Sequence, residues 1–165
     1  MSRLARSLIA ALALSAAAVP VSSFAAQSAP SAAPNATGVV RLRSANGFDE
    51  TVARLKADVQ GKGIRYFDTI DQAALGASAD LHIGRSTLVL FGNPPLGVQF
   101  LQSNPYSGLD WPVRMLVVEE ADGAVYVAWT DFAFVAERYG IDNRGPQFAM
   151  ASEVAASVAT AATTN

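Results

Sequence analysis

The chain has 165 residues, of which 51% are apolar and 16% are charged, and its formal net charge is −2. This composition is typical of a single globular domain with one hydrophobic core. The slightly acidic balance argues against nucleic acid as a partner. Because the sequence contains no cysteine, it excludes disulfide bonds, thiolate metal sites and cysteine nucleophiles.

Residues 1–25 have the three-part layout of a secretory signal peptide. Arg3 and Arg6 precede an apolar run over residues 8–19, and small residues follow it up to Ala25. The apolar run is shorter than the roughly 20 residues that cross a bilayer, so we expect cleavage rather than anchoring. The sequence therefore predicts an exported protein, periplasmic or secreted, with no membrane partner once the signal is removed.

Residues 26–37 are Ala, Ser, Pro, Gln, Asn and Thr without any charge. Such a segment buries too little apolar surface to offset the entropy of ordering it, which predicts a disordered linker. One domain is expected over residues 38–160, with its C-terminal helix at about 146–160. Residues 161–165 are expected to form a frayed tail.

The first part of this domain predicts a strand, a helix and a second strand. Apolar and polar residues alternate over residues 38–44 and 64–71, as in half-buried strands. Between them, apolar residues recur at helical spacing from Phe48 to Val59, which predicts an amphipathic helix. Asn46 precedes this helix and is expected to cap it.

The middle of the chain is organised around one irregular connection. Residues 72–81 are small and Ala-rich and predict a loose helical turn. Residues 87–91 are apolar on both faces, so we expect a central strand that is covered on both sides. The following segment, residues 93–112, is rich in Pro, Gly and Asn and connects this strand to another over residues 112–120.

The last part predicts a hairpin and two helices. The Asp122-Gly123 pair between two β-rich runs is a strong hairpin signal. Asp131 is expected to cap a helix that Gly140 ends, and the C-terminal helix follows. These elements predict an α+β fold, a single β-α-β-β-β-β-α type domain with a mainly antiparallel sheet and helices on one face.

Several short motifs follow one another at characteristic separations. They are Phe91-Gly92-Asn93-Pro94, Gly97, Asn104-Pro105, Gly108-Leu109-Asp110, Pro112, Asp122-Gly123 and the helix from Asp131 to Gly140. In these motifs the sequence resembles the uncharacterised DUF302 family over most of the domain. The resemblance implies the β-α-β-β-β-β-α arrangement and brings no established activity. The chain departs from the family pattern at Gln72, where histidine is usual, and at Phe132, where proline is common.

Five residues of the 93–112 connection are candidates for a binding site. Asp110, Asn93 and Asn104 supply acceptors and amide donors for a polar pocket, although turn chemistry alone explains residues of these types. Tyr106 and Trp111 are large aromatic residues in loop sequence, and we expect them at a pocket mouth or interface.

Metal and cofactor chemistry have little support in the sequence. His82 is the single histidine, and no spaced cluster of carboxylates accompanies it, so no metal site is predicted. The proline-containing loop at 92–97 lacks the ending and the amide donors of a phosphate-binding loop. We therefore expect no cofactor.

The sequence favours binding over catalysis. We expect an exported, non-catalytic domain that binds a small apolar or amphipathic ligand, or a second copy of itself as a homodimer, through residues 93–112. The alternative is a small cofactor-independent enzyme in which Asp110 is the general base and Asn93 or Asn104 donates to an oxyanion.

Overall fold

The computed structural model describes residues 33–165, so the predicted signal peptide and most of the predicted linker lie outside the described residues. Within them, every pair of neighbouring strands is antiparallel, and the sheet order is β1-β5-β4-β3-β2. The strands are β1 (Val39–Arg43), β2 (Arg65–Asp71), β3 (Ser86–Gly92), β4 (Val113–Glu119) and β5 (Val125–Thr130).

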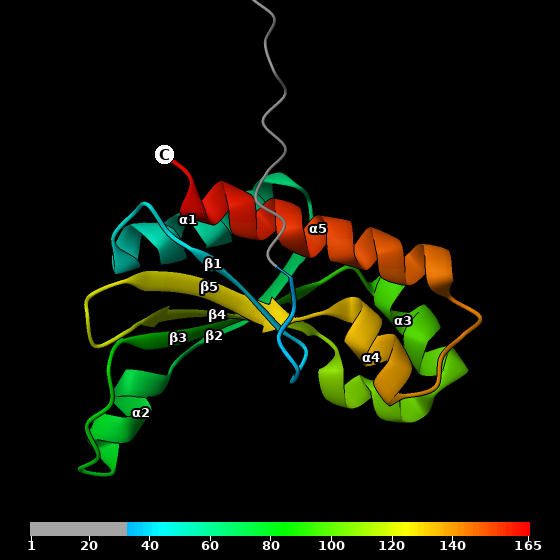
Figure 1. Ribbon diagram of the computed structural model, residues 1–165, viewed down its shortest axis with the longest axis horizontal. Coiled ribbons are helices and arrows are strands. Elements are labelled where there is room, and N and C mark those ends of the chain that lie inside the picture. Colours follow the sequence, from blue (N-terminus) through cyan, green and yellow to red (C-terminus); the bar gives the residue numbers. More distant parts are fainter. Residues whose placement is uncertain (1–32) are drawn as a thin grey trace, which may run out of the picture.

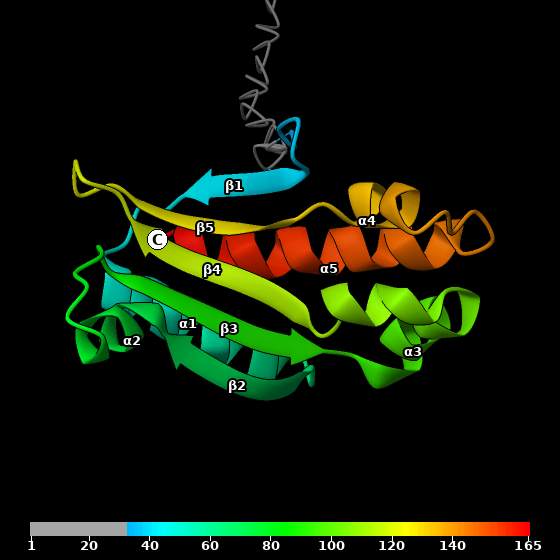
Figure 2. The same cartoon turned by 90° about the horizontal axis from the view of Figure 1, so that it is seen from below.

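Two long helices cover one face of this sheet. They are α1 (Phe48–Gly61) and α5 (Gly145–Thr163), and they lie side by side on the same side of the strands (Figures 1 and 2). The remaining helices lie beyond the strand ends: α2 (Gln72–Ser78), α3 (Pro94–Ser103), η1 (Pro105–Asp110) and α4 (Phe132–Arg138). The predicted α+β class and its antiparallel sheet are confirmed.

Helix α1 buries the predicted apolar stripe, but its cap is different from the prediction. Leu55 and Val59 are fully buried, whereas the N-cap position is Gly47 and no side chain bonds there. The side-chain amide of Asn46 instead donates to the carbonyl oxygens of Ala162 and Thr164, at 3.2 and 3.1 Å. Asn46 therefore joins the start of α1 to the end of α5.

Strand β3 is central but is not covered on both sides, so that prediction is wrong. Val89 and Phe91 face α1 and α5 and are 0% and 1% exposed. Leu88 and Leu90 point to the other face and stay half-buried. Among residues 33–165, the two long helices both lie on the first face, which leaves the second with only its neighbouring side chains as cover (Figure 2).

The predicted β4–β5 hairpin is confirmed by the register of the two strands. Gly123 has a φ of +80°, a conformation that glycine adopts without steric penalty. The Asp122 carboxylate accepts from the backbone N–H of Ala124 at 3.0 Å. Asp131 caps α4 as expected, because its carboxylate accepts from the backbone N–H of Phe134 at 3.2 Å.

Both ends of the described domain have local structure. Before β1, the Asn35 side chain accepts from the backbone N–H of Thr37 and Val39 at 3.0 and 2.9 Å, so residues 35–37 form a turn. Helix α5 continues to Thr163 because Ala162 and Thr163 are buried, at 0% and 4% exposure. No helix within residues 33–165 combines the length and the apolar character needed to cross a membrane.

Candidate functional site

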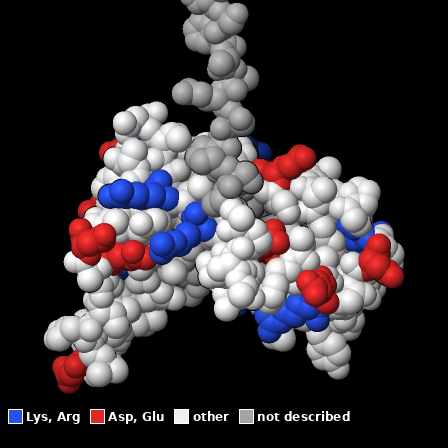
Figure 3. All heavy atoms as spheres, viewed as in Figure 1, with Lys and Arg blue, Asp and Glu red and all other residues white. Residues whose placement is uncertain are grey.

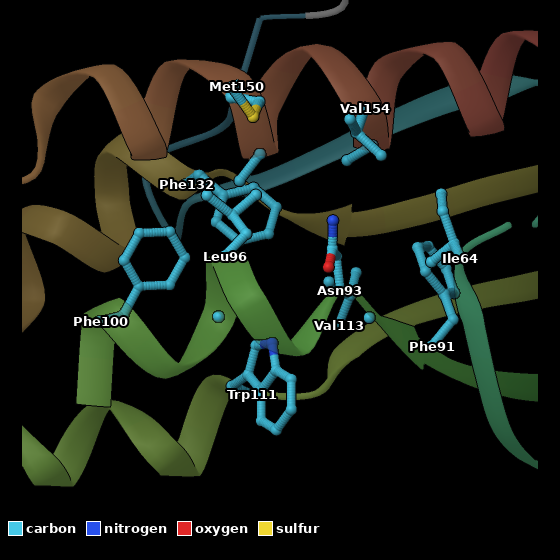
Figure 4. A pocket seen from close by; sticks show the side chains of 14 residues that line it. Ile64, Phe91, Asn93, Leu96, Phe100, Trp111, Val113, Phe132, Met150 and Val154 are labelled. Atoms are coloured by element: carbon cyan, nitrogen blue, oxygen red, sulfur yellow. The ribbon is translucent and has the colours of Figure 1, made fainter. Parts of the chain in front are cut away.

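The connection between β3 and β4 encloses an apolar pocket of about 80 Å³ at one end of the sheet. Phe91 at the end of β3 and Phe100 of α3 form part of its wall, and Phe132 of α4 adds another aromatic ring. Met150 and Val154 of α5 lie across from them (Figure 4). The pocket thus brings together four elements that are far apart in the sequence.

Trp111 forms one side of the pocket by packing directly on two glycines. A Cβ atom added to Gly97 would lie 1.8 Å from the indole Nε1, and one added to Gly92 would lie 3.3 Å from it. The indole can occupy this position only because Gly97 has no side chain. Phe67 and Trp111 form a T-shaped aromatic pair, with their ring centroids 5.9 Å apart.

Two polar groups of the pocket have no partner among the described residues. Asn93 occupies the N-cap position of α3, yet its side chain makes no capping bond. The figure shows this amide among the apolar side chains of the wall (Figure 4). The indole N–H of Trp111 likewise has no acceptor within residues 33–165. An apolar pocket with a few unpaired polar groups is the usual form of a small-molecule site.

The volume limits what the pocket can hold in this conformation. Its 80 Å³ is about half of the roughly 150 Å³ of an engineered cavity that binds benzene. A short alkyl group fits, whereas a drug-sized molecule does not. Met150 at the rim is 54% exposed, and its unbranched thioether side chain can rotate to admit a longer group.

Asp110 lies outside this pocket, in a cluster that fixes η1 to β4 and α4. Its side chain is 4% exposed and forms ion pairs with Arg114 and Arg138. The hydroxyl of Tyr139 donates to Oδ2 at 2.6 Å. This hydrogen bond to the carboxylate, followed by burial, raises the pKa of Tyr139. Since both carboxylate oxygens of Asp110 are occupied, the geometry gives no support to Asp110 as a general base.

Asn104 and Tyr106 are also away from the pocket. The Asn104 side chain accepts from the backbone N–H of Tyr106 at 3.0 Å and donates to the carbonyl of Tyr139 at 2.8 Å. It therefore caps η1, as turn chemistry predicts. Tyr106 itself is 74% exposed and lines no part of the pocket.

Of the five candidate residues, the structure brings Asn93 and Trp111 to the pocket and leaves the other three elsewhere. Sequence reasoning missed Met150 and Val154, which belong to a helix about 40 residues further along the chain and carry no motif of their own. Within residues 33–165, no group of three or more metal-binding side chains converges.

The architecture defines an α+β domain with a five-stranded antiparallel sheet and packed helices. The chain matches the family model described as "Domain of unknown function DUF302" over residues 40–164. It therefore belongs to the DUF302 family, as the sequence resemblance predicts.

Curated relatives include three longer proteins from Brucella species. The sequence is 31% identical over 105 residues to "Fluoride-specific ion channel FluC 1" of Brucella suis and of Brucella abortus, and to "FluC 2" of Brucella melitensis. The match covers 64% of this chain and 41%, 39% and 39% of those proteins. This chain thus spans about two-fifths of the length of these relatives.

A solved structure has the same fold. It is the "uncharacterized conserved protein DUF302 from Bacillus stearothermophilus", which superposes with a TM-score of 0.70. The alignment covers 77% of this chain and 99% of that one, at 15% sequence identity. At this level of identity the similarity concerns the fold alone.

Proposed function

We propose that this domain binds a small apolar or amphipathic molecule in the pocket beside Trp111. The observation that carries the proposal is the combination of apolar walls with two unpaired polar groups, Asn93 and the indole N–H, at the same hollow. The apolar end of the ligand lies against Phe91 and Phe100. Its polar end remains near Asn93, which is exposed.

The size of the pocket sets the expected affinity. Each buried methylene contributes about 0.8 kcal/mol, so an alkyl group of about four carbons gains roughly 3 kcal/mol, which corresponds to millimolar binding or weaker. Tighter binding requires the pocket to widen, and the rim at Met150 is where space can be gained. We expect affinity to rise along a series of linear alcohols until the pocket is filled.

A cavity-filling variant tests this proposal. Ala151 of α5 is buried and lines the pocket, whereas Ala149 of the same helix is exposed. In Ala151→Leu the added carbons occupy the pocket, and we expect calorimetric binding of 1-butanol through 1-octanol to be lost. Ala149→Leu is the matched control and keeps wild-type binding. Equal binding by both variants would contradict the proposal.

The same samples distinguish a ligand from a second copy of the chain. Light scattering gives the molar mass of the wild type and of Ala151→Leu without any alcohol. Occupation of the pocket by another copy predicts a dimeric wild type that becomes monomeric in the variant. Occupation by a small molecule predicts the same molar mass for the wild type and for Ala151→Leu.

The Brucella relatives favour a second candidate function, which is participation in fluoride handling. Their names describe fluoride-specific ion channels. As an alternative, we propose that the N–H groups of the Asn93 side chain and the Trp111 indole donate to a fluoride ion. The test is the NMR signal of the Trp111 indole in sodium fluoride and in sodium chloride at equal ionic strength. A shift specific to fluoride supports the second candidate, and identical spectra contradict it.

We also propose that the chain is exported. The support is the signal-like layout of residues 1–25. Expression in a Gram-negative host should yield a periplasmic protein that begins at Ala26 or Gln27 by mass spectrometry. An intact Met1 terminus in the membrane pellet would show an anchor instead.

A further inference from the structure

A second hollow lies at the opposite end of β3, between α1 and the β2–β3 edge of the sheet. Its volume is about 520 Å³, within the range of roughly 300–1,000 Å³ that is typical of ligand sites. Unlike the apolar pocket, it has several charged and hydroxyl-bearing side chains in its lining. These include Asp49, Lys56, Thr69, Asp71, Arg85 and Thr87.

The strand register places three of these side chains on one small area of the sheet. Asp71 of β2 and Thr87 of β3 are direct cross-strand partners, so their Cβ atoms are about 5 Å apart on the same face. Thr69 is two residues before Asp71 and points to the same side. The floor of the hollow is therefore a carboxylate flanked by two hydroxyl groups.

The charges around this floor do not all pair with each other. Arg85 forms an ion pair with Asp49 and stacks over the Phe48 ring, with its Cζ 4.2 Å from the centroid. No ion pair among residues 33–165 includes Lys56 or Asp71. The hollow thus presents one unpaired ammonium and one unpaired carboxylate that do not reach each other.

Each of these two groups is nevertheless held in place. Lys56 extends over the Tyr66 ring, with Nζ 5.4 Å from the centroid. One oxygen of Asp71 accepts from the backbone N–H of Ala74 at 2.9 Å and caps α2. The second oxygen has no partner among the described residues. The two charges are positioned by the fold rather than by mutual attraction.

Thr87 is the independent observation that points to a ligand. It is 7% exposed, yet its hydroxyl has no hydrogen-bond partner among residues 33–165. Its neighbours bond elsewhere: Thr69 accepts from Tyr66, and Ser86 donates to Gln72. The hydroxyl oxygen is not fully enclosed by protein atoms, so it stays accessible from outside. Its position in the lining of the hollow gives this hydroxyl access to a bound molecule.

We propose that this hollow binds a small zwitterion, a molecule that carries one ammonium and one carboxylate group. The ammonium group contacts the free oxygen of Asp71, and the carboxylate contacts Lys56. The hydroxyl of Thr87 bonds a polar group of the ligand between them. This site is separate from the apolar pocket and does not depend on the function proposed for it.

An NMR titration of the full chain with zwitterions of increasing length tests this site. The probes are glycine, 4-aminobutanoate and 6-aminohexanoate, and the singly charged controls are butanoate and butylammonium. We expect the backbone amide signals of Thr69, Asp71 and Thr87 to shift with at least one zwitterion and not with either control. No shift with any zwitterion, or equal shifts with the controls, would overturn the proposal.

Conservative variants separate binding from folding. Lys56→Gln and Asp71→Asn should each weaken binding of the best zwitterion at least tenfold, and asparagine at position 71 still caps α2. Asp68→Asn is the matched control, because Asp68 lies on the same strand and lines no part of the hollow. Its binding should equal that of the wild type, and a loss as large as in Asp71→Asn would contradict the assignment.

Thr87→Val gives the most specific signature. Replacement of this hydroxyl by a methyl group should weaken zwitterion binding and leave the melting temperature of the free protein close to that of the wild type. A purely structural Thr87 would change stability alone. If a folded Thr87→Val protein binds the zwitterion with wild-type affinity, Thr87 does not contact the ligand, and the proposed site is contradicted.

Discussion

The two ends of β3 have hollows of opposite character. At the end with Phe91 and Gly92, aromatic rings and helix α5 enclose an apolar pocket, and Trp111 packs on glycine. At the start, Thr87 lies in an open hollow with charges of both signs. One strand thus supports two sites, and their difference lies in what the neighbouring connections supply. A long connection closes the first end, whereas the α2 segment projects away from the second (Figure 1).

The charged side chains on the surface are mixed in sign. Acidic and basic side chains are interspersed over the face seen in Figure 3, and they form no extended area of one sign. Some of these charges form ion pairs, as in the Asp110 cluster and in the pair between Arg54 and Glu50. Lys56 and Asp71 form no ion pair among residues 33–165, and both line the same hollow.

The largest effect is expected at the apolar end of β3. Phe91 is 1% exposed and contributes to both the core and the pocket wall. Phe91→Ala should lower the free energy of unfolding by about 3–5 kcal/mol through lost burial and a residual cavity. Val98→Ala, at a position that is 43% exposed, should change it by no more than about 0.5 kcal/mol. Urea denaturation compares the two variants. Equal midpoints would contradict the placement of Phe91 in the core and in the pocket wall.

A smaller loss is expected in the fully paired cluster. Asp110→Asn removes the charge that Arg114 and Arg138 share. We expect about 1–3 kcal/mol of destabilisation, toward the lower end because the arginines are 46% and 51% exposed. Glu50→Gln, in an exposed pair, should cost at most about 0.5 kcal/mol. If the two variants unfold at the same urea concentration, the cluster does not fix η1.

The contact between Trp111 and glycine gives the third prediction. Gly97→Ala places a methyl group where the indole lies, so the ring must move, at a cost of about 1–3 kcal/mol. Gly61 in α1 has no atom within 4 Å of an added Cβ, and Gly61→Ala should be neutral or stabilising by up to about 1 kcal/mol. Thermal unfolding and tryptophan fluorescence measure both variants. An unmoved emission maximum in Gly97→Ala would contradict the contact.

The elements of the fold were predictable because their signals are local. The alternation over 38–44, the helical stripe from Phe48 to Val59 and the Asp122-Gly123 turn each follow from a few neighbouring residues. The 93–112 connection was also visible, since proline and glycine mark it. The role of Asn46 could not be predicted, because the carbonyl groups to which it donates lie more than 100 residues further along the chain.

The site was less predictable for a physical reason. Asp110 carries no local sign that Arg138 and Tyr139 occupy its carboxylate. The polar hollow depends on a strand register and on the absence of ion pairs, and neither leaves a motif. The helix-free face of the sheet was missed because the apolar run at 87–91 is equally compatible with cover on one side or two.

The smallest effect is a pH dependence in the Asp110 cluster. The hydrogen bond to Asp110 raises the pKa of Tyr139 above its ordinary value of 10.0. Folding therefore favours the neutral phenol, and this stabilisation is complete below about pH 10 and is lost as the pH rises through the folded-state pKa. Tyr139→Phe should show a flatter decline of stability above pH 10 than the wild type. Parallel declines in urea titrations would contradict the role of this bond.

The two tryptophans provide the most direct test of the apolar site. Trp111 lines the pocket, whereas Trp129 is 7% exposed in the core and lines no part of it. Both indole N–H groups give separate signals in one ¹H–¹⁵N spectrum, which Trp129→Phe assigns. Titration with 1-hexanol should shift the Trp111 signal progressively and leave the Trp129 signal in place. If neither signal moves, or if both move together, the pocket beside Trp111 is not a ligand site.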